Sequence, residues 1–100
     1  MAFTQIIEVQ SDDVEAVEKH VFDWDRRQKG IAPGYQSARI LADRKLPGTY
    51  LIEVEFDSEE DAKRNDARQE TNEWTNQFRT LIKSDPSYRN LTEVCSTDRS

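Results

Sequence analysis

Cysteine, histidine and glycine are scarce in this sequence, which has one, one and three of them among 100 residues. Cys95 therefore has no partner for an internal disulfide, and together with His20 it cannot supply the ligand set of a zinc site. The three glycines are too few for a glycine-rich loop that binds phosphate groups. We therefore expect no metal site, and the lone cysteine favours a reducing compartment, which predicts a cytoplasmic protein.

Positive charge and long apolar runs are also in short supply. The sequence has 14 basic and 20 acidic residues, which gives a net charge of −6 at pH 7. A surface of this sign repels phosphate backbones and anionic lipid headgroups, so we expect neither nucleic acid nor a membrane as a partner. No apolar stretch approaches the roughly 20 residues of a membrane-spanning helix, and no basic-then-apolar signal pattern opens the chain.

Alternating and helical patterns of apolar residues predict six elements in the order strand, helix, strand, strand, helix, strand. Their expected ranges are residues 3–9, 12–29, 35–43, 49–56, 58–84 and 88–96. This order is typical of the ferredoxin-like βαββαβ plait, an α+β fold in which helices cover one face of a four-stranded antiparallel sheet. We expect one domain over residues 1–96 and a polar tail at 97–100. The plait hosts many unrelated functions, so the fold alone does not assign one.

The second helical region is expected to break. The stretch between Asn65 and Thr71 carries no apolar stripe, whereas Trp74 and Phe78 beyond it have helical spacing on one face. Ser58 suits the cap of a first short helix, and Thr71 suits the cap of a second one. We therefore predict two helices here rather than one.

Two short stretches resemble a known family. One is Pro33-Gly34-Tyr35, and the other covers residues 50–62 and continues through Glu70-Thr71-Asn72-Glu73-Trp74. Together with the element order over residues 3–95, they resemble the antibiotic-biosynthesis-monooxygenase-like domains of the dimeric α/β-barrel superfamily. The resemblance implies a homodimer whose sheets pack face to face, and a small pocket between each sheet and its own helices. Many members oxidise a quinol-like aromatic or open haem without a bound metal or flavin, so no cofactor is expected, and others have no known activity.

Few of the family's site residues carry over to this sequence. Haem-degrading members use an asparagine on the first strand, with a tryptophan and a histidine late in the chain. Here Gln5 stands on the first strand, Trp74 matches the tryptophan, and no histidine follows His20. Quinol-oxidising members pair an asparagine with a tryptophan. Asn72 and Trp74 are the nearest such pair, although residues two apart on a helix do not share a face.

The predicted pocket suits a small aromatic or quinol-like molecule, because aromatic walls stack on flat rings. The candidate catalytic residues are Trp74 and His20, which could take a proton near neutral pH. The candidate substrate-binding residues are Tyr35, Tyr50, Asn72 and Phe78. We expect the walls of the pocket to be Trp74, Phe78, Tyr50 and Val17. We expect His20 and Tyr35 to lie nearest its mouth.

The sequence leaves three functions open. The first is a ligand-binding domain related to cofactor-free monooxygenases, and whether it is catalytic is itself open. The second is a non-catalytic dimer that is structural or senses a ligand. The third is an isomerase or dehydratase of the same superfamily, with His20 as the base. An RNA-recognition domain has the same element order, but Leu51 and Glu53 occupy third-strand positions where such domains need stacking rings.

Overall fold

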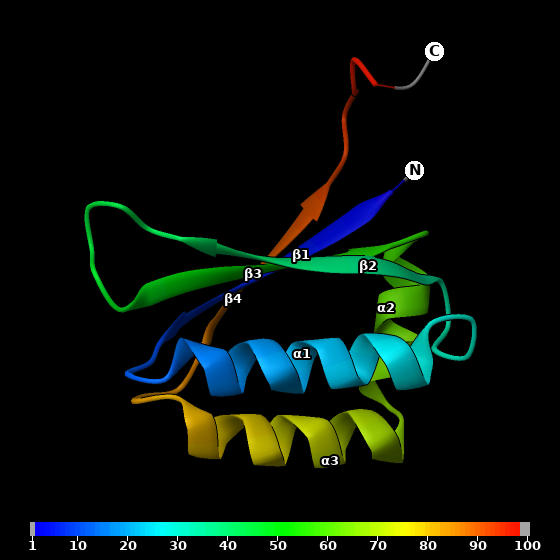
Figure 1. Ribbon diagram of the computed structural model, residues 1–100. Helices are drawn as coiled ribbons and strands as arrows, with labels where there is room; N and C mark the ends of the chain where they lie inside the picture. The colour runs from blue at the N-terminus through cyan, green and yellow to red at the C-terminus, as the bar shows by residue number, and fades with distance from the viewer. Residues whose placement is uncertain (1, 99–100) are drawn as a thin grey trace.

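The computed structural model describes residues 2–98 and confirms the predicted order of elements (Figure 1). The strands are β1 (Phe3–Gln10), β2 (Tyr35–Ala42), β3 (Thr49–Phe56) and β4 (Ser87–Thr92). The helices are α1 (Val14–Gln28), α2 (Glu59–Asp66) and α3 (Gln69–Phe78), and a 3₁₀ turn, η1 (Arg79–Leu81), follows α3. Within residues 2–98 no helix is long and apolar enough to cross a membrane.

All four strands form one antiparallel sheet in the order β2-β3-β1-β4, which is the ferredoxin-like arrangement. Side chains alternate between the two faces, so Gln5 and Ile7 of β1 both point toward the helices. The register places Ile52 of β3 and Tyr88 of β4 on either side of Ile7, and it places Asn90 beside Gln5. Residues from both ends of the chain therefore share the helix-covered face.

Helix α1 covers this face through an apolar stripe along one side of the helix. Val17 and Val21 are buried in one core cluster with Ile7 and Ile52. Trp24 continues the stripe into a second cluster near the C-terminal end of the helix. Residues spaced by three or four positions share one side of a helix, so a single stripe reaches both clusters.

The start of α1 is fixed by two small polar side chains. Asp13 caps the helix, and its carboxylate accepts a hydrogen bond from the Ala16 N–H at 3.2 Å. The buried Ser11 hydroxyl accepts from the Asp13 N–H and donates to the Leu81 carbonyl, both at 3.0 Å. Ser11 thereby ties the start of α1 to the turn that follows α3.

The predicted break in the second helical region is confirmed, but the predicted cap is wrong. Only Ala67 and Arg68 separate α2 from α3. The Arg68 N–H donates to the Asn65 carbonyl at 3.1 Å, which closes a tight turn and lets the next helix begin early. Thr71 therefore lies inside α3, where its hydroxyl donates to the Asn65 side-chain oxygen at 3.1 Å.

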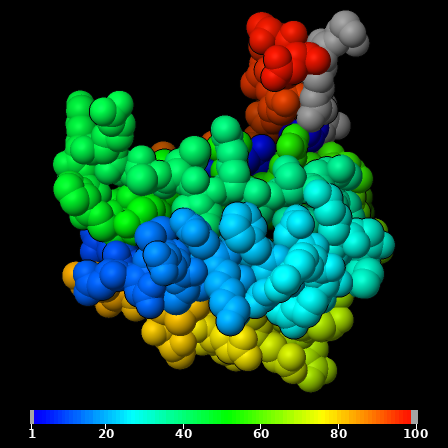
Figure 2. Space-filling model, in the orientation of Figure 1, coloured from blue at the N-terminus to red at the C-terminus, as the bar shows by residue number. Residues whose placement is uncertain are grey.

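The last strand is shorter than predicted. Its final residue, Thr92, pairs with Phe3, where β1 begins, so the chain beyond has no neighbouring strand. The following segment stands away from the rest of the domain (Figures 1 and 2). Val94 is 88% exposed and Cys95 is also exposed. Of the predicted tail at 97–100, residues 99 and 100 lie outside the described residues.

Candidate functional site

A cavity of 390 Å³ lies between the sheet and α3. It exists because α3 lies beside α1 instead of lying flat on the sheet, and α2 carries the chain outward from the sheet to α3 (Figure 1). Its volume is toward the lower end of the roughly 300–1,000 Å³ typical of small-molecule sites.

The floor and one wall of the cavity are apolar. Ile7, Ile52 and Phe56 of the sheet line it, and each is at most 4% exposed. Trp24 from α1 and Trp74 from α3 form the wall, with ring centroids 5.9 Å apart and planes tilted by 59°. This lining offers apolar and aromatic surface to a flat ring.

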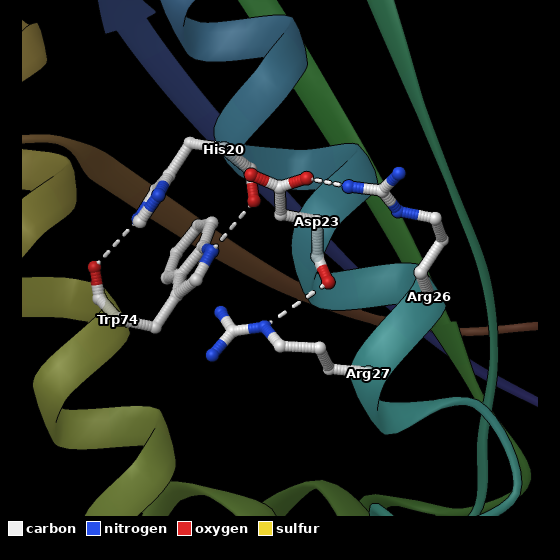
Figure 3. Close-up of polar contacts among 5 residues, drawn as sticks. All are labelled: His20, Asp23, Arg26, Arg27 and Trp74. Carbon is white, nitrogen blue, oxygen red and sulfur yellow. Dashed lines mark hydrogen bonds and ion pairs between the residues drawn. The ribbon is translucent and has the colours of Figure 1, made fainter.

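Trp74 is held in place by His20 through a reciprocal pair of hydrogen bonds (Figure 3). The Trp74 indole N–H donates to the His20 carbonyl at 3.0 Å, and His20 Nε2 lies 2.9 Å from the Trp74 carbonyl. Their rings stack at 4.6 Å, and Phe78 stacks on the indole at 4.7 Å. The indole is therefore fixed by bonds at its nitrogen and by ring contacts.

The charged pairs beside this arrangement belong to the surface of α1. The Asp23 carboxylate pairs with Arg26, and the Asp23 carbonyl accepts from Arg27 Nε at 3.3 Å (Figure 3). None of the three is among the residues that line the cavity. Their ion pair is exposed, so it contributes little to stability.

Asn65 supplies a buried amide to the cavity. The residue is 5% exposed and lines the cavity from the last turn of α2. Its side-chain oxygen accepts hydrogen bonds from Arg68 Nη1 at 3.3 Å and from the Thr71 hydroxyl at 3.1 Å. With the oxygen occupied by two donors, the amide N–H₂ is the group left to donate to a ligand.

The rim of the cavity is polar and exposed. Asp66 and Asn72 form it on the helical side, and Tyr88 and Asn90 form it on β4. Gln5 lies beside this strand and donates to the Asn90 side-chain oxygen at 3.3 Å. The site therefore combines an apolar floor with amide, hydroxyl and carboxyl groups at its opening.

Two rim groups have shifted acidities. Partial burial raises the pKa of the Asp66 carboxyl. Burial also raises the pKa of the Tyr88 hydroxyl. Arg79 opposes that shift, and the carboxylates of Asp66 and Asp85 add to it. Asp66 and Tyr88 are thus close enough across the rim to influence each other.

Of the predicted site residues, Trp74 and Asn72 line the cavity. Thr71 and Thr75 line it with them, because residues three or four apart share the inner side of α3. Asn72 flanks that side at the rim and is exposed. The predicted asparagine and tryptophan therefore both border the cavity, although they do not point in one direction.

The other predicted site residues do not line the cavity. His20 and the fully buried Phe78 lie against Trp74 instead. Tyr35 is buried where β2 begins, and its hydroxyl donates to the Asp25 carboxylate at 2.6 Å. Burial and this carboxylate raise the pKa of Tyr35. Tyr50 packs against the core cluster that contains Val17. None of these four side chains lines the cavity, so none is placed to contact a ligand there.

Sequence reasoning missed most of the polar groups that line the cavity. Alternation along β1 puts Gln5 on the same face as Ile7, and this is the one signal in the sequence that points to a polar lining group. Asn65 and Asp66 lie in the stretch without an apolar stripe, which indicated only a helix break. Tyr88 and Asn90 reach the site through the pairing of β4 with β1, which no local pattern encodes.

Within residues 2–98, no cluster of three or more histidine, cysteine, aspartate or glutamate side chains is placed to hold a metal ion. The polar groups of the cavity are mostly neutral amides and hydroxyls. Such groups orient a ligand by hydrogen bonds, while the two indoles and the sheet residues bind its apolar surface. The arrangement suits a small flat molecule with one polar edge.

Neither a protein-family model nor a curated protein matches this sequence, but solved structures share its fold. A candidate antibiotic biosynthesis monooxygenase from Bordetella bronchiseptica has a TM-score of 0.79 at 13% identity, over 94% of this chain and 98% of that one. A second candidate, from Caulobacter crescentus, has a TM-score of 0.76 at 15% identity, over 93% and 90%. SnoaB, a cofactor-independent oxygenase from Streptomyces nogalater, has a TM-score of 0.73 at 15% identity, over 96% of each chain.

The match covers nearly the whole of each chain, so the shared architecture includes both layers that enclose the cavity. At these identities the likeness concerns the fold and not the individual site residues. The chain therefore has the fold of the antibiotic-biosynthesis-monooxygenase-like proteins, as its sequence resemblance predicted.

Proposed function

We propose that this chain binds a small aromatic or quinol-like molecule in the cavity between its sheet and α3. The observation that carries the proposal is the lining itself, with Trp24 and Trp74 on one wall and a buried Asn65 amide beside them. A flat ring gains dispersion and stacking contacts from the indoles, and the amide can donate to a ring oxygen. A purely structural domain would gain more by filling this space with side chains.

The proposed activity is oxidation of such a ligand by dioxygen, in the manner of SnoaB, which is described as a cofactor-independent oxygenase. When dioxygen places one oxygen atom on a ring carbon of a phenol, the product is a quinone. The second oxygen atom leaves as water with the two hydrogens that the phenol loses, one from the ring C–H and one from the O–H, so the reaction balances without a further reductant. Here the chain would hold the ring against Trp74 and exclude bulk water. The alternative is a ligand-sensing domain, which binds the same class of molecule without turnover.

The test is a titration with hydroxylated naphthalenes and hydroquinones. Tryptophan fluorescence measures binding, and the concentration of dissolved oxygen measures turnover. Binding with oxygen uptake supports an oxygenase, and binding without uptake supports the sensing alternative. If no member of the panel changes the fluorescence or the melting temperature, the chain is a structural domain.

Trp74→Phe tests the wall of the cavity. The variant keeps an aromatic ring but loses the larger stacking surface and the bond to the His20 carbonyl at 3.0 Å. We expect most of the fluorescence response to vanish and affinity to fall by about threefold to tenfold, since aromatic contacts contribute ~0.5–1.5 kcal/mol. The matched variant Trp24→Phe should keep the response of Trp74, and an unchanged response in Trp74→Phe would contradict this placement.

We further propose that the chain is a homodimer that pairs through the sheet face opposite the helices. That face carries Ile6, Leu41, Leu51 and Leu91 between charged residues. No helix of residues 2–98 covers this face, so it is open to a second copy (Figure 1). The cavity lies on the other face, and a dimer of this kind leaves its rim open.

A further inference from the structure

Asp66 is placed at the rim of the cavity without a partner. It is the last residue of α2 and lines the cavity opening. Within residues 2–98 its carboxylate has neither an ion pair nor a side-chain hydrogen bond. Partial burial also raises its pKa, which shows that the charged form is disfavoured where it stands.

This position is unfavourable for folding. The C-terminal end of a helix carries partial negative charge, so a carboxylate there is destabilising. Two other acids of α2 are compensated, because Glu59 pairs with Lys63 and Asp61 pairs with Arg64. Residues that violate local rules without compensation tend to mark functional sites.

The nearest following cation is directed elsewhere. Arg68 donates to Glu70 at 2.8 Å and to the Asn65 side-chain oxygen at 3.3 Å. It therefore orients the Asn65 amide and leaves Asp66 unneutralised. The two residues present complementary groups to the cavity, since the amide of Asn65 donates and the carboxylate of Asp66 accepts.

The ionisable groups around Asp66 exclude an anionic ligand. Asp66 and Tyr88 are the titratable residues that line the cavity, and no lysine or arginine of residues 2–98 lines it. Arg79 and Asp85 act on Tyr88 from outside the lining. A ligand with its own carboxylate would face Asp66 without a compensating cation, which costs binding energy.

We propose that Asp66 selects the ligand by accepting a hydrogen bond from a hydroxyl group on a neutral aromatic ring. This inference rests on the proposed function and names its ligand class: phenols and hydroquinones, with a neighbouring ring oxygen for the Asn65 amide to donate to. The ring lies against Trp74, and its hydroxyl edge faces the rim. Aromatic carboxylates and methyl ethers of the same size are rejected.

Three stable probes separate these claims: 2-naphthol, 2-methoxynaphthalene and 2-naphthoate. Their ring is the same, and they differ in a hydroxyl donor, a blocked oxygen and a negative charge. We expect calorimetry at pH 7 to show 2-naphthol binding at least about tenfold more tightly than the ether, because a hydrogen bond to a charged group is a strong one. We expect 2-naphthoate to bind most weakly.

Asp66→Asn should reduce the preference for 2-naphthol over the ether to less than about threefold. The variant should also melt at the same temperature or higher at pH 7. Because burial raises the folded-state pKa of Asp66, the destabilising effect of its charge is fully present above that pKa and is relieved as the pH falls. Asp85→Asn is the matched control, since Asp85 also acts on Tyr88 but does not line the cavity, and it should keep the preference.

In the parent chain, the preference for 2-naphthol should decline as the pH falls through the raised pKa of Asp66, because the protonated carboxyl is a weaker acceptor. Equal binding of 2-naphthol and the ether overturns the role of Asp66 and leaves the proposed function intact. A lower melting temperature for Asp66→Asn, with an unchanged preference, shows a structural residue and also overturns the role. If none of the three probes binds, the proposed function itself fails.

Discussion

His20 is placed to hold Trp74 and not to exchange protons with a ligand. The Trp74 carbonyl can only accept, so His20 Nε2 at 2.9 Å from it must carry a hydrogen. The imidazole stacks on the indole and does not line the cavity. The isomerase or dehydratase reading, in which His20 is the base, therefore lacks the contact that it needs.

Substitutions at His20 distinguish a role in positioning Trp74 from a role in catalysis. His20→Ala removes a hydrogen bond and a stacked ring, and we expect it to lower the free energy of unfolding by about 1–3 kcal/mol and to weaken ligand binding. His20→Gln can still donate to the Trp74 carbonyl, so it should recover part of the stability and most of the affinity. Urea unfolding and ligand titration measure both. A His20→Gln chain that is stable and binds ligand but no longer consumes oxygen would identify His20 as a base.

At the scale of elements, the break between α2 and α3 shapes the cavity. The turn at Ala67 and Arg68 redirects the chain outward, so that α3 faces the sheet across a gap. The Thr71 hydroxyl fastens the first turn of α3 to Asn65 at the end of α2. The same contact fixes the orientation of the amide that faces the cavity.

Thr71→Val should test this contact because it keeps the shape of the side chain and removes the hydroxyl. The buried Asn65 oxygen would lose one of its two donors, and we expect the free energy of unfolding to fall by about 1 kcal/mol. Thr71→Ser keeps the hydroxyl and should be closer to the parent chain in urea unfolding. Equal stability of Thr71→Val and Thr71→Ser would show that the hydrogen bond does not hold the two helices together.

The sequence predicted what depends on local periodicity. Val17, Val21 and Trp24 recur at helical spacing and are buried, because a helical repeat identifies the face that must leave water. The cavity depends instead on long-range contacts. The offset of α3 is held by the reciprocal bonds between His20 and Trp74, which are far apart in the sequence. No pattern within one element encodes the position of α3 relative to the sheet. Most of the residues that the sequence predicts at the pocket therefore lie in the core instead.

At the scale of the whole molecule, the two faces of the sheet differ in how they are covered. Leu41 lies directly opposite Leu51 on the face without helices, and Leu41 is 38% exposed. Leu91, also on this face, is 44% exposed. The ion pairs Arg39–Glu53 and Glu8–Arg89 lie among these leucines at 3.2 and 3.5 Å. A second copy of the same face would bury the leucines and place charged residues at its edges.

Leu51→Glu should therefore convert a dimer into a monomer, because it places a carboxylate at the centre of the proposed interface, beside Glu8 and Glu53. Light scattering should give the parent chain twice the mass of 11.7 kDa and the variant that single mass. Leu46→Glu is the matched control, since Leu46 is 56% exposed in the loop between β2 and β3, outside the strands. A parent chain of 11.7 kDa at micromolar concentration would rule out the dimer. Because the cavity lies on the helix-covered face of the sheet and Leu51 lies on the opposite face, the Leu51→Glu monomer should still bind ligand, so assembly and binding can be tested independently.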